Sequence, residues 1–104
     1  MEQLSLFVIG DEDTVLGFRL AGLPGVVATS ADQARAALQD ALRRPDLKIV
    51  ILTERLAWQI REEVDRHLMR VHWPLIIEVP DREGPAPERR SVHDLVRAAI
   101  GFKI

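Results

Sequence analysis

The chain contains no cysteine and no tyrosine among its 104 residues. Without cysteine, it has no disulfide framework, no thiolate zinc site and no cysteine nucleophile. It also lacks a large excess of charge of either sign, because its formal net charge is -2. A protein without a broad positive field is a poor candidate for sequence-independent binding of DNA or RNA. We therefore expect no nucleic-acid partner.

Long hydrophobic runs are absent as well. No apolar stretch approaches the roughly 20 residues that span a bilayer. The start of the chain, Met1-Glu2-Gln3, lacks the basic residues of a signal peptide. The length predicts one domain, and 47% hydrophobic with 29% charged residues is ordinary for a globular protein. We expect a cytoplasmic protein without direct membrane insertion.

Short apolar runs predict the strands. Residues 4–9, 48–53 and 75–79 are rich in valine, isoleucine and leucine and show no polar alternation. This pattern is typical of strands buried on both faces of a parallel sheet. Residues 26–28, after the turn Leu23-Pro24-Gly25, form a weaker fourth candidate.

Helical spacing separates these runs. A helix that ends near Leu42 has Ser30 as its predicted N-cap and Gln33 three residues later, which is a capping-box arrangement. A short helix is predicted over 13–21, with Gly22 as its left-handed C-terminal residue. A third is predicted over 54–68 with Thr53 as N-cap, and its inward stripe comprises Ala57, Ile60, Val64 and Leu68.

Strict alternation of strands and helices predicts an α/β fold: a four-stranded parallel sheet in the order 2-1-3-4, flanked by helices, flavodoxin- or receiver-like. Residues 80–90 contain three prolines and many charges, which indicates a linker. A last helix follows, with Ser91 as its cap. We therefore expect a globular domain at 1–79, a linker at 80–90 and a C-terminal helical segment at 91–104.

Ligands of open parallel sheets bind beyond the carboxyl ends of the central strands. There the sequence places the acidic turn Asp11-Glu12-Asp13 and the pair Thr53-Glu54. No phosphate-binding glycine motif is present, and three carboxylates would repel a phosphate. The acidic turn either caps the next helix or holds Mg²⁺, as in a divergent receiver-like signalling module. We favour the cap, and expect no cofactor and no metal.

No catalytic constellation is visible either. The three histidines, His67, His72 and His93, have no zinc-type spacing. Ser91, His93 and Asp94 lie within four residues of one predicted helix, where a nucleophile and its base cannot reach each other. We therefore expect a protein that is not an enzyme on its own.

Partner contact is the remaining kind of function. Trp58 lies off the inward stripe of its predicted helix, and exposed tryptophan is enriched at interfaces. The other candidates surround the last predicted helix. They are Arg89, Arg90, Val92, Leu95, Val96, Ala99, Ile100 and Phe102.

One family accounts for these segments in order. The run Gly10-Asp-Glu-Asp-Thr-Val-Leu-Gly-Phe-Arg-Leu-Ala-Gly22 resembles the opening signature of the F subunit of V-type (archaeal and bacterial) ATP synthases/ATPases. Ile51-Leu-Thr-Glu54, Pro74-Leu-Ile-Ile-Glu-Val-Pro80 with Gly84-Pro85, and Val96-Arg-Ala-Ala-Ile-Gly101 match as well. The resemblance spans nearly the whole chain.

The resemblance implies a non-catalytic component of the central stalk, peripheral to the membrane. Its implied partners are the coiled-coil D subunit of the rotor, the catalytic A/B hexamer through the C-terminal helix, and the connector of the membrane sector. Such a rotor couples ATP synthesis or hydrolysis to ion transport. The resemblance further implies a mobile, regulatory C-terminal helix.

Overall fold

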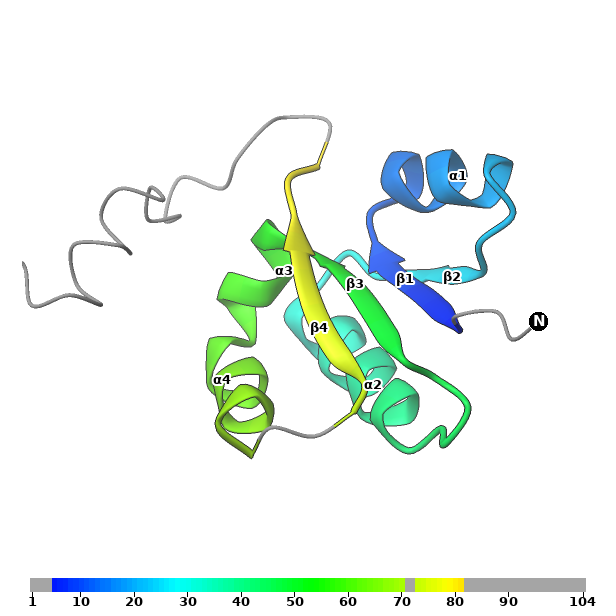
Figure 1. The fold of residues 1–104 in the computed structure, drawn as a ribbon. Coiled ribbons are helices and arrows are strands. Elements are labelled where there is room, and N and C mark those ends of the chain that lie inside the picture. Colours follow the sequence, from blue (N-terminus) through cyan, green and yellow to red (C-terminus); the bar gives the residue numbers. More distant parts are fainter. Residues whose placement is uncertain (1–4, 71–72, 82–104) are drawn as a thin grey trace, which may run out of the picture.

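The computed structural model describes residues 5–70 and 73–81 as a sheet with helices on both sides (Figure 1). Strands and helices alternate along the chain, apart from two consecutive helices before the last strand. In order, they are β1 (Leu6–Gly10), α1 (Glu12–Leu20), β2 (Gly25–Val27), α2 (Ala31–Leu42), β3 (Ile49–Thr53), α3 (Glu54–Gln59), α4 (Arg61–Arg70) and β4 (Leu75–Val79). Within the described ranges no helix is long and apolar enough to cross a bilayer.

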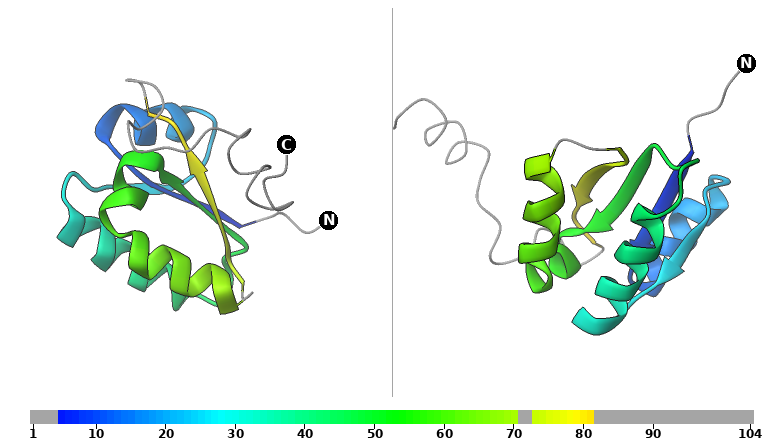
Figure 2. Two further views of the ribbon diagram at one scale, coloured as in Figure 1. Left: turned by 90° about the vertical axis from the view of Figure 1, so that its left-hand side faces the viewer. Right: turned by 90° about the horizontal axis from the view of Figure 1, so that it is seen from below.

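The four strands form one parallel sheet in the order β2-β1-β3-β4, which confirms the predicted fold class. The chain moves from β1 outward to β2, then crosses back over β1 to β3. Because crossovers between parallel strands are right-handed, this reversal places α1 on one face and the later helices on the other. Figure 2 shows α1 on the side of the sheet opposite α2, α3 and α4.

The main core lies between the sheet and helices α2, α3 and α4. Ile9 and Val50 of the central strands are fully buried there. The other buried members are Ala28, Ala34, Leu38, Ala41, Leu47, Leu52, Leu56, Ala57, Ile60, Val64 and Ile76. Val8, whose side chain points to the opposite face from that of Ile9, is fully buried on the α1 side. β1 is therefore covered on both faces.

The helix ends follow the local sequence. The Ser30 hydroxyl accepts a hydrogen bond from the Gln33 backbone N–H at 3.2 Å, as predicted. In a capping box the Gln33 side chain would in turn accept a hydrogen bond from the backbone N–H of Ser30. Here Gln33 Oε1 accepts instead from the backbone N–H of Thr29. Gly22 has a φ of 92°, which confirms its predicted left-handed conformation.

The single helix predicted over 54–68 is wrong. Two helices occupy this stretch, because Ile60 leaves the helical conformation at φ −124° and ψ 38°. Ala57, Ile60 and Val64 are buried as expected. Leu68 is 45% exposed, against the prediction that it faces inward. The helical phase restarts after Ile60, so the stripe through Ala57 does not continue to Leu68.

Glycine at the first position of β2 allows the edge strand to approach β1. A Cβ atom added at Gly25 would lie 2.7 Å from the backbone oxygen of Val8. We expect Gly25→Ala to lower the free energy of unfolding by about 1–3 kcal/mol, because β2 must shift away from β1. Urea denaturation monitored by circular dichroism measures this change.

Gly17→Ala is the matched control. Gly17 lies within α1, and an added Cβ meets no atom within 4 Å. Alanine there should raise the free energy of unfolding by about 0.5–1 kcal/mol through helix propensity. Equal destabilisation by both substitutions would contradict the close-approach argument.

Candidate functional site

The crevice between β1 and β3, where the sequence places the candidate site, is filled by side chains. A Cβ atom added at Gly10 would lie 2.8 Å from Cγ2 of Thr53 and 3.3 Å from Cγ2 of Thr14. Thr53 is only 1% exposed. It stands at the N-cap of α3 as predicted, but its side chain makes no capping hydrogen bond. A ligand at the reversal point would have to displace these threonines.

Asp11 caps α1, which confirms the favoured interpretation of the acidic turn. Its Oδ2 accepts a hydrogen bond from the Thr14 backbone N–H at 3.2 Å, and its Oδ1 accepts from the Thr14 hydroxyl. Burial alone would raise the pKa of Asp11, but these hydrogen bonds outweigh it and hold the pKa below its ordinary value. Glu12 and Asp13 lie exposed in the first turn, where they complement the helix dipole.

A second carboxylate at this edge is also engaged. Asp81 follows β4, and its Oδ2 accepts a hydrogen bond from Nε of Arg55 at 2.7 Å. The Asp81 side chain is 8% exposed and that of Arg55 is 33% exposed, so the carboxylate of this ion pair is largely removed from water. Within residues 5–70 and 73–81 no group of three histidine or acidic side chains is placed to hold a metal ion. The edge is thus built from internally matched polar groups.

Substitution of Asp11 tests its capping role. Asp11→Ala should lower the free energy of unfolding at pH 7 by about 0.5–2 kcal/mol, because the Thr14 N–H loses its acceptor. Asp11→Asn should cost less, since asparagine also caps helices. Thermal unfolding of the two variants, with Glu12→Ala as an exposed control in the same turn, measures the difference.

The charge of Asp11 makes a pH-dependent contribution to the stability of the fold. Its folded pKa is lowered, so the stabilisation is fully present above the unfolded pKa of about 4 and is lost as the pH falls through the folded pKa. The difference in stability between wild type and Asp11→Asn should therefore shrink between about pH 5 and pH 2. A difference that stays constant over this range would contradict the charged cap.

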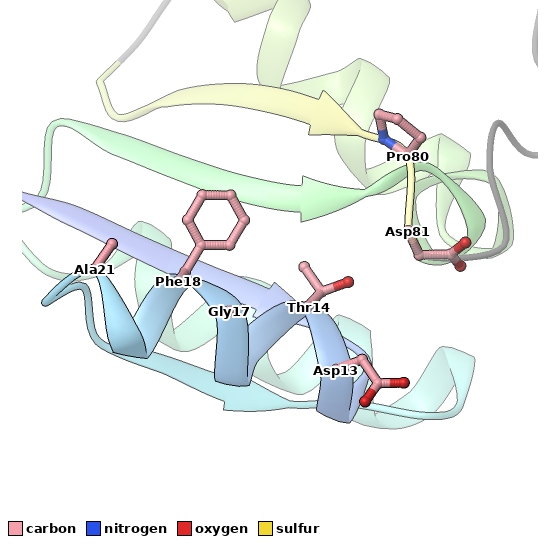
Figure 3. Close-up of a pocket in the computed structure, with 7 residues that line it drawn as sticks. All are labelled: Asp13, Thr14, Gly17, Phe18, Ala21, Pro80 and Asp81. Carbon is pink, nitrogen blue, oxygen red and sulfur yellow. The ribbon is translucent and has the colours of Figure 1, made fainter.

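On the α1 side, an apolar groove of about 510 Å³ separates α1 from the end of β4. Phe18 projects from α1 toward the strands, and Pro80 and Asp81 lie across from Thr14 (Figure 3). Gly17 leaves the α1 wall of this groove without a side chain. The groove adjoins a part of the sheet that α1 does not reach.

Among the described residues, this uncovered part lies over β3 and β4. Register places Ile51 beside Ile77 and Ile49 beside Leu75, all on the α1 side. Leu75 and Ile77 are 47% and 44% exposed, although both are large apolar side chains. We define Leu75 and Ile77, with half-buried Ile49 and Ile51, as the open sheet face.

The open sheet face corrects one prediction. The apolar run at 75–79 indicated burial on both faces, yet β4 is covered only on the side of α3 and α4 in the described structure. The sequence signal for this surface was present, since Leu75, Ile77 and Val79 leave no polar residue on the α1 side of the run. The sequence of this run could not predict that its side chains are exposed, because their exposure depends on where α1 packs.

Trp58 is the single predicted interface residue within the described ranges. It is half-buried, and the Arg61 guanidinium carbon lies 5.8 Å from the centroid of its ring. The indole is therefore partly covered by its own chain. The other predicted interface residues, Arg89 to Phe102, lie outside the described residues, as do His93, the 91–104 helix and most of the 80–90 linker.

Comparison with known proteins gives the family. Residues 6–96 match the family model described as ATP synthase (F/14-kDa) subunit. The chain belongs to this family. It is 37% identical to the F subunit of the A-type ATP synthase of Pyrococcus furiosus, over 97% of this chain and 98% of that one. It is 34% identical to the corresponding F subunit of Methanothermobacter thermautotrophicus, over 96% and 95% of the two chains.

A solved structure agrees with this result. The F subunit of the V-type ATP synthase from Archaeoglobus fulgidus superposes with a TM-score of 0.61 at 29% identity. The match covers 75% of this chain and 99% of that chain. This chain is therefore an F subunit of an A/V-type ATP synthase, as its opening signature indicates.

Proposed function

We propose that this F subunit is a non-catalytic rotor component of the central stalk. It binds the coiled-coil D subunit, and with it couples ATP synthesis or hydrolysis to ion transport. The observation that carries this proposal is the filled crevice at the carboxyl edge: Thr53 and Thr14 occupy the place where related folds hold ligands. The nucleotide chemistry then belongs to the A and B subunits, and this chain acts through its surfaces.

The C-terminal segment at 91–104 is proposed as a regulatory helix, joined by the 80–90 linker to the domain at 1–79. It carries the apolar residues Val92, Leu95, Val96 and Ile100 at helical spacing. The open sheet face offers this stripe a docking surface in the free protein, and the A/B hexamer offers another in the assembly. The connector of the membrane sector completes the proposed contacts and keeps the chain peripheral to the membrane.

Co-expression with the D subunit tests the central proposal. We expect a stable complex of the two chains that survives size-exclusion chromatography, because the open sheet face and the C-terminal stripe leave apolar area to bury. The full chain should show neither Mg²⁺ binding nor labelling by acetyl phosphate. Labelling that disappears in Asp11→Asn, without a complex with the D subunit, would support a receiver-like module instead.

Hydrogen exchange tests the movable helix. We expect weak amide protection over 89–104 in the free protein, where docking on the open sheet face barely offsets the entropy of ordering the segment, and strong protection in the assembly, where a partner buries the same stripe. Ile77→Asp should abolish the residual protection in the free protein. Leu20→Asp, at an 81% exposed position on α1, should leave it unchanged. Strong protection of equal size in both states would remove the regulatory role.

A further inference from the structure

A second groove lies on the opposite face of the molecule, between α2 and α4. Its volume is about 380 Å³. α2 contributes positions 35, 38, 39 and 42, and α4 contributes positions 63, 66, 67 and 70. Both sets follow the spacing i, i+3, i+4 and i+7, so each wall runs for two helical turns, roughly 10 Å. A channel between two parallel stripes of this length has the shape that receives a third helix.

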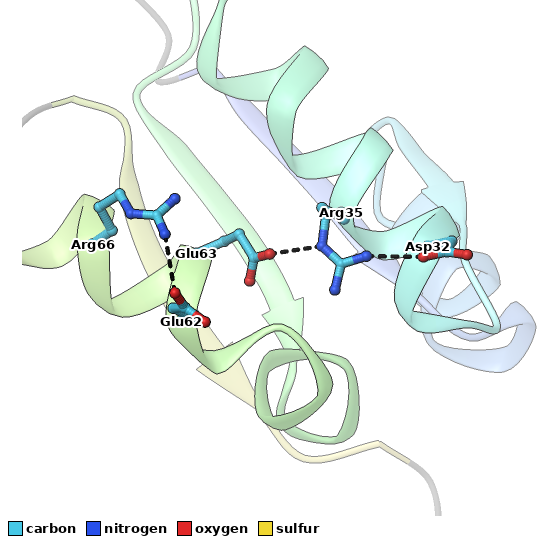
Figure 4. Close-up of polar contacts among 5 residues, drawn as sticks. All are labelled: Asp32, Arg35, Glu62, Glu63 and Arg66. Atoms are coloured by element: carbon cyan, nitrogen blue, oxygen red, sulfur yellow. Dashed lines mark hydrogen bonds and ion pairs between the residues drawn. The ribbon is translucent and has the colours of Figure 1, made fainter.

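The walls of this groove are predominantly basic. Arg35, Arg66 and Arg70 line it, against the single carboxylate of Glu63. Arg35 donates a hydrogen bond from Nε to Glu63 at 2.6 Å and contacts Asp32 at 2.8 Å (Figure 4). In the described part of the chain, Arg70 makes no ion pair. The lining therefore has a positive excess, which the carboxylates of Asp32 and Glu62, just outside the lining, partly offset.

Apolar surface accompanies this charge. Leu38 is buried in the floor of the groove, and Leu42 is half-buried beside it. Trp73 also lines the groove, from the segment just before β4, and is 66% exposed. An occupant thus meets an apolar floor flanked by guanidinium groups, with an aromatic anchor beside them. Tryptophan and arginine are among the residues most enriched at interface hot spots.

We infer that the α2–α4 groove binds an acidic amphipathic helix from another protein chain. Carboxylates at the helix flanks pair with Arg66 and Arg70, while its apolar face covers Leu42 and Trp73. The Arg66 guanidinium donates to Glu62 at 3.4 Å on the exposed surface, and such pairs are weak. A guanidinium in this state can exchange to an incoming carboxylate, and its fork binds one in a bidentate geometry.

The chain's own C-terminal segment does not fit this groove. Residues 89–104 carry Arg89, Arg90, Arg97 and Lys103 against the single carboxylate side chain of Asp94. Like charge on both sides would oppose docking. The C-terminal segment is therefore not the occupant of the α2–α4 groove, which requires an acidic one.

The groove adds a second interface to the proposed function. This inference rests on the chain's place in an ATP synthase, but it does not depend on contact with the D subunit. A photo-crosslinking residue at position 39, in the wall of the groove, tests it in the purified assembly. Mass spectrometry identifies the captured peptide. We expect a segment of another protein of the assembly with carboxylates and apolar residues at helical spacing.

Charge reversal makes the test specific. Arg66→Glu combined with Arg70→Glu should lower the crosslink yield about tenfold, because repulsion replaces attraction along one wall. Arg43→Glu is the matched control: its side chain is 77% exposed at the end of α2, outside the groove, and the yield should not change. Circular dichroism of each variant verifies that the fold is intact.

Three outcomes would overturn the inference: no crosslink, capture of residues 89–104 of the same chain, or capture of a peptide without carboxylates. Capture of nucleic acid would do the same. The presence of the D subunit in the same preparation is scored separately. If the assembly contains the D subunit but gives no crosslink, the groove inference is rejected and the rotor proposal stands. If an acidic peptide is captured but the D subunit is absent, the groove inference stands and the rotor proposal is rejected.

Discussion

The contact of Gly10 with Thr53 is the constraint on which the rest of the structure depends. The central strands β1 and β3 end side by side, and the threonine side chain closes the space between their carboxyl ends. This packing requires glycine at position 10, because any Cβ there would overlap Thr53. A site that would hold a ligand in many sheets of this topology is used here for internal packing.

Two carboxylates at this edge make internal contacts. Asp11 is committed to capping α1, and Asp81 is paired with Arg55. Each carboxylate gains a hydrogen-bond partner that offsets the cost of partial burial. Asp11 and Asp81 are thus held apart, one in a helix cap and the other in an ion pair.

Ion pairs between helices and strands hold the outer layers in place. Arg61 of α4 makes two hydrogen bonds to Glu78 of β4, at 3.1 and 2.6 Å, and Arg35 joins α2 to α4 through Glu63. The bidentate geometry orients α4 along the edge strand. Because the hydrogen bond from Arg35 lowers the pKa of Glu63, this bridge persists into mildly acidic conditions.

The sequence by itself determined the order of elements, the parallel sheet, the caps at Ser30 and Asp11, and the left-handed Gly22. These features depend on neighbouring residues or on the apolar period, which the sequence displays directly. Only the tertiary structure decided that Thr53 fills the crevice, that the 54–68 segment breaks at Ile60, and that the described helices leave one face of β4 open. These features depend on where α1 packs and on which side chains meet across strands. An apolar run does not indicate which elements far apart in the chain will pack against each other.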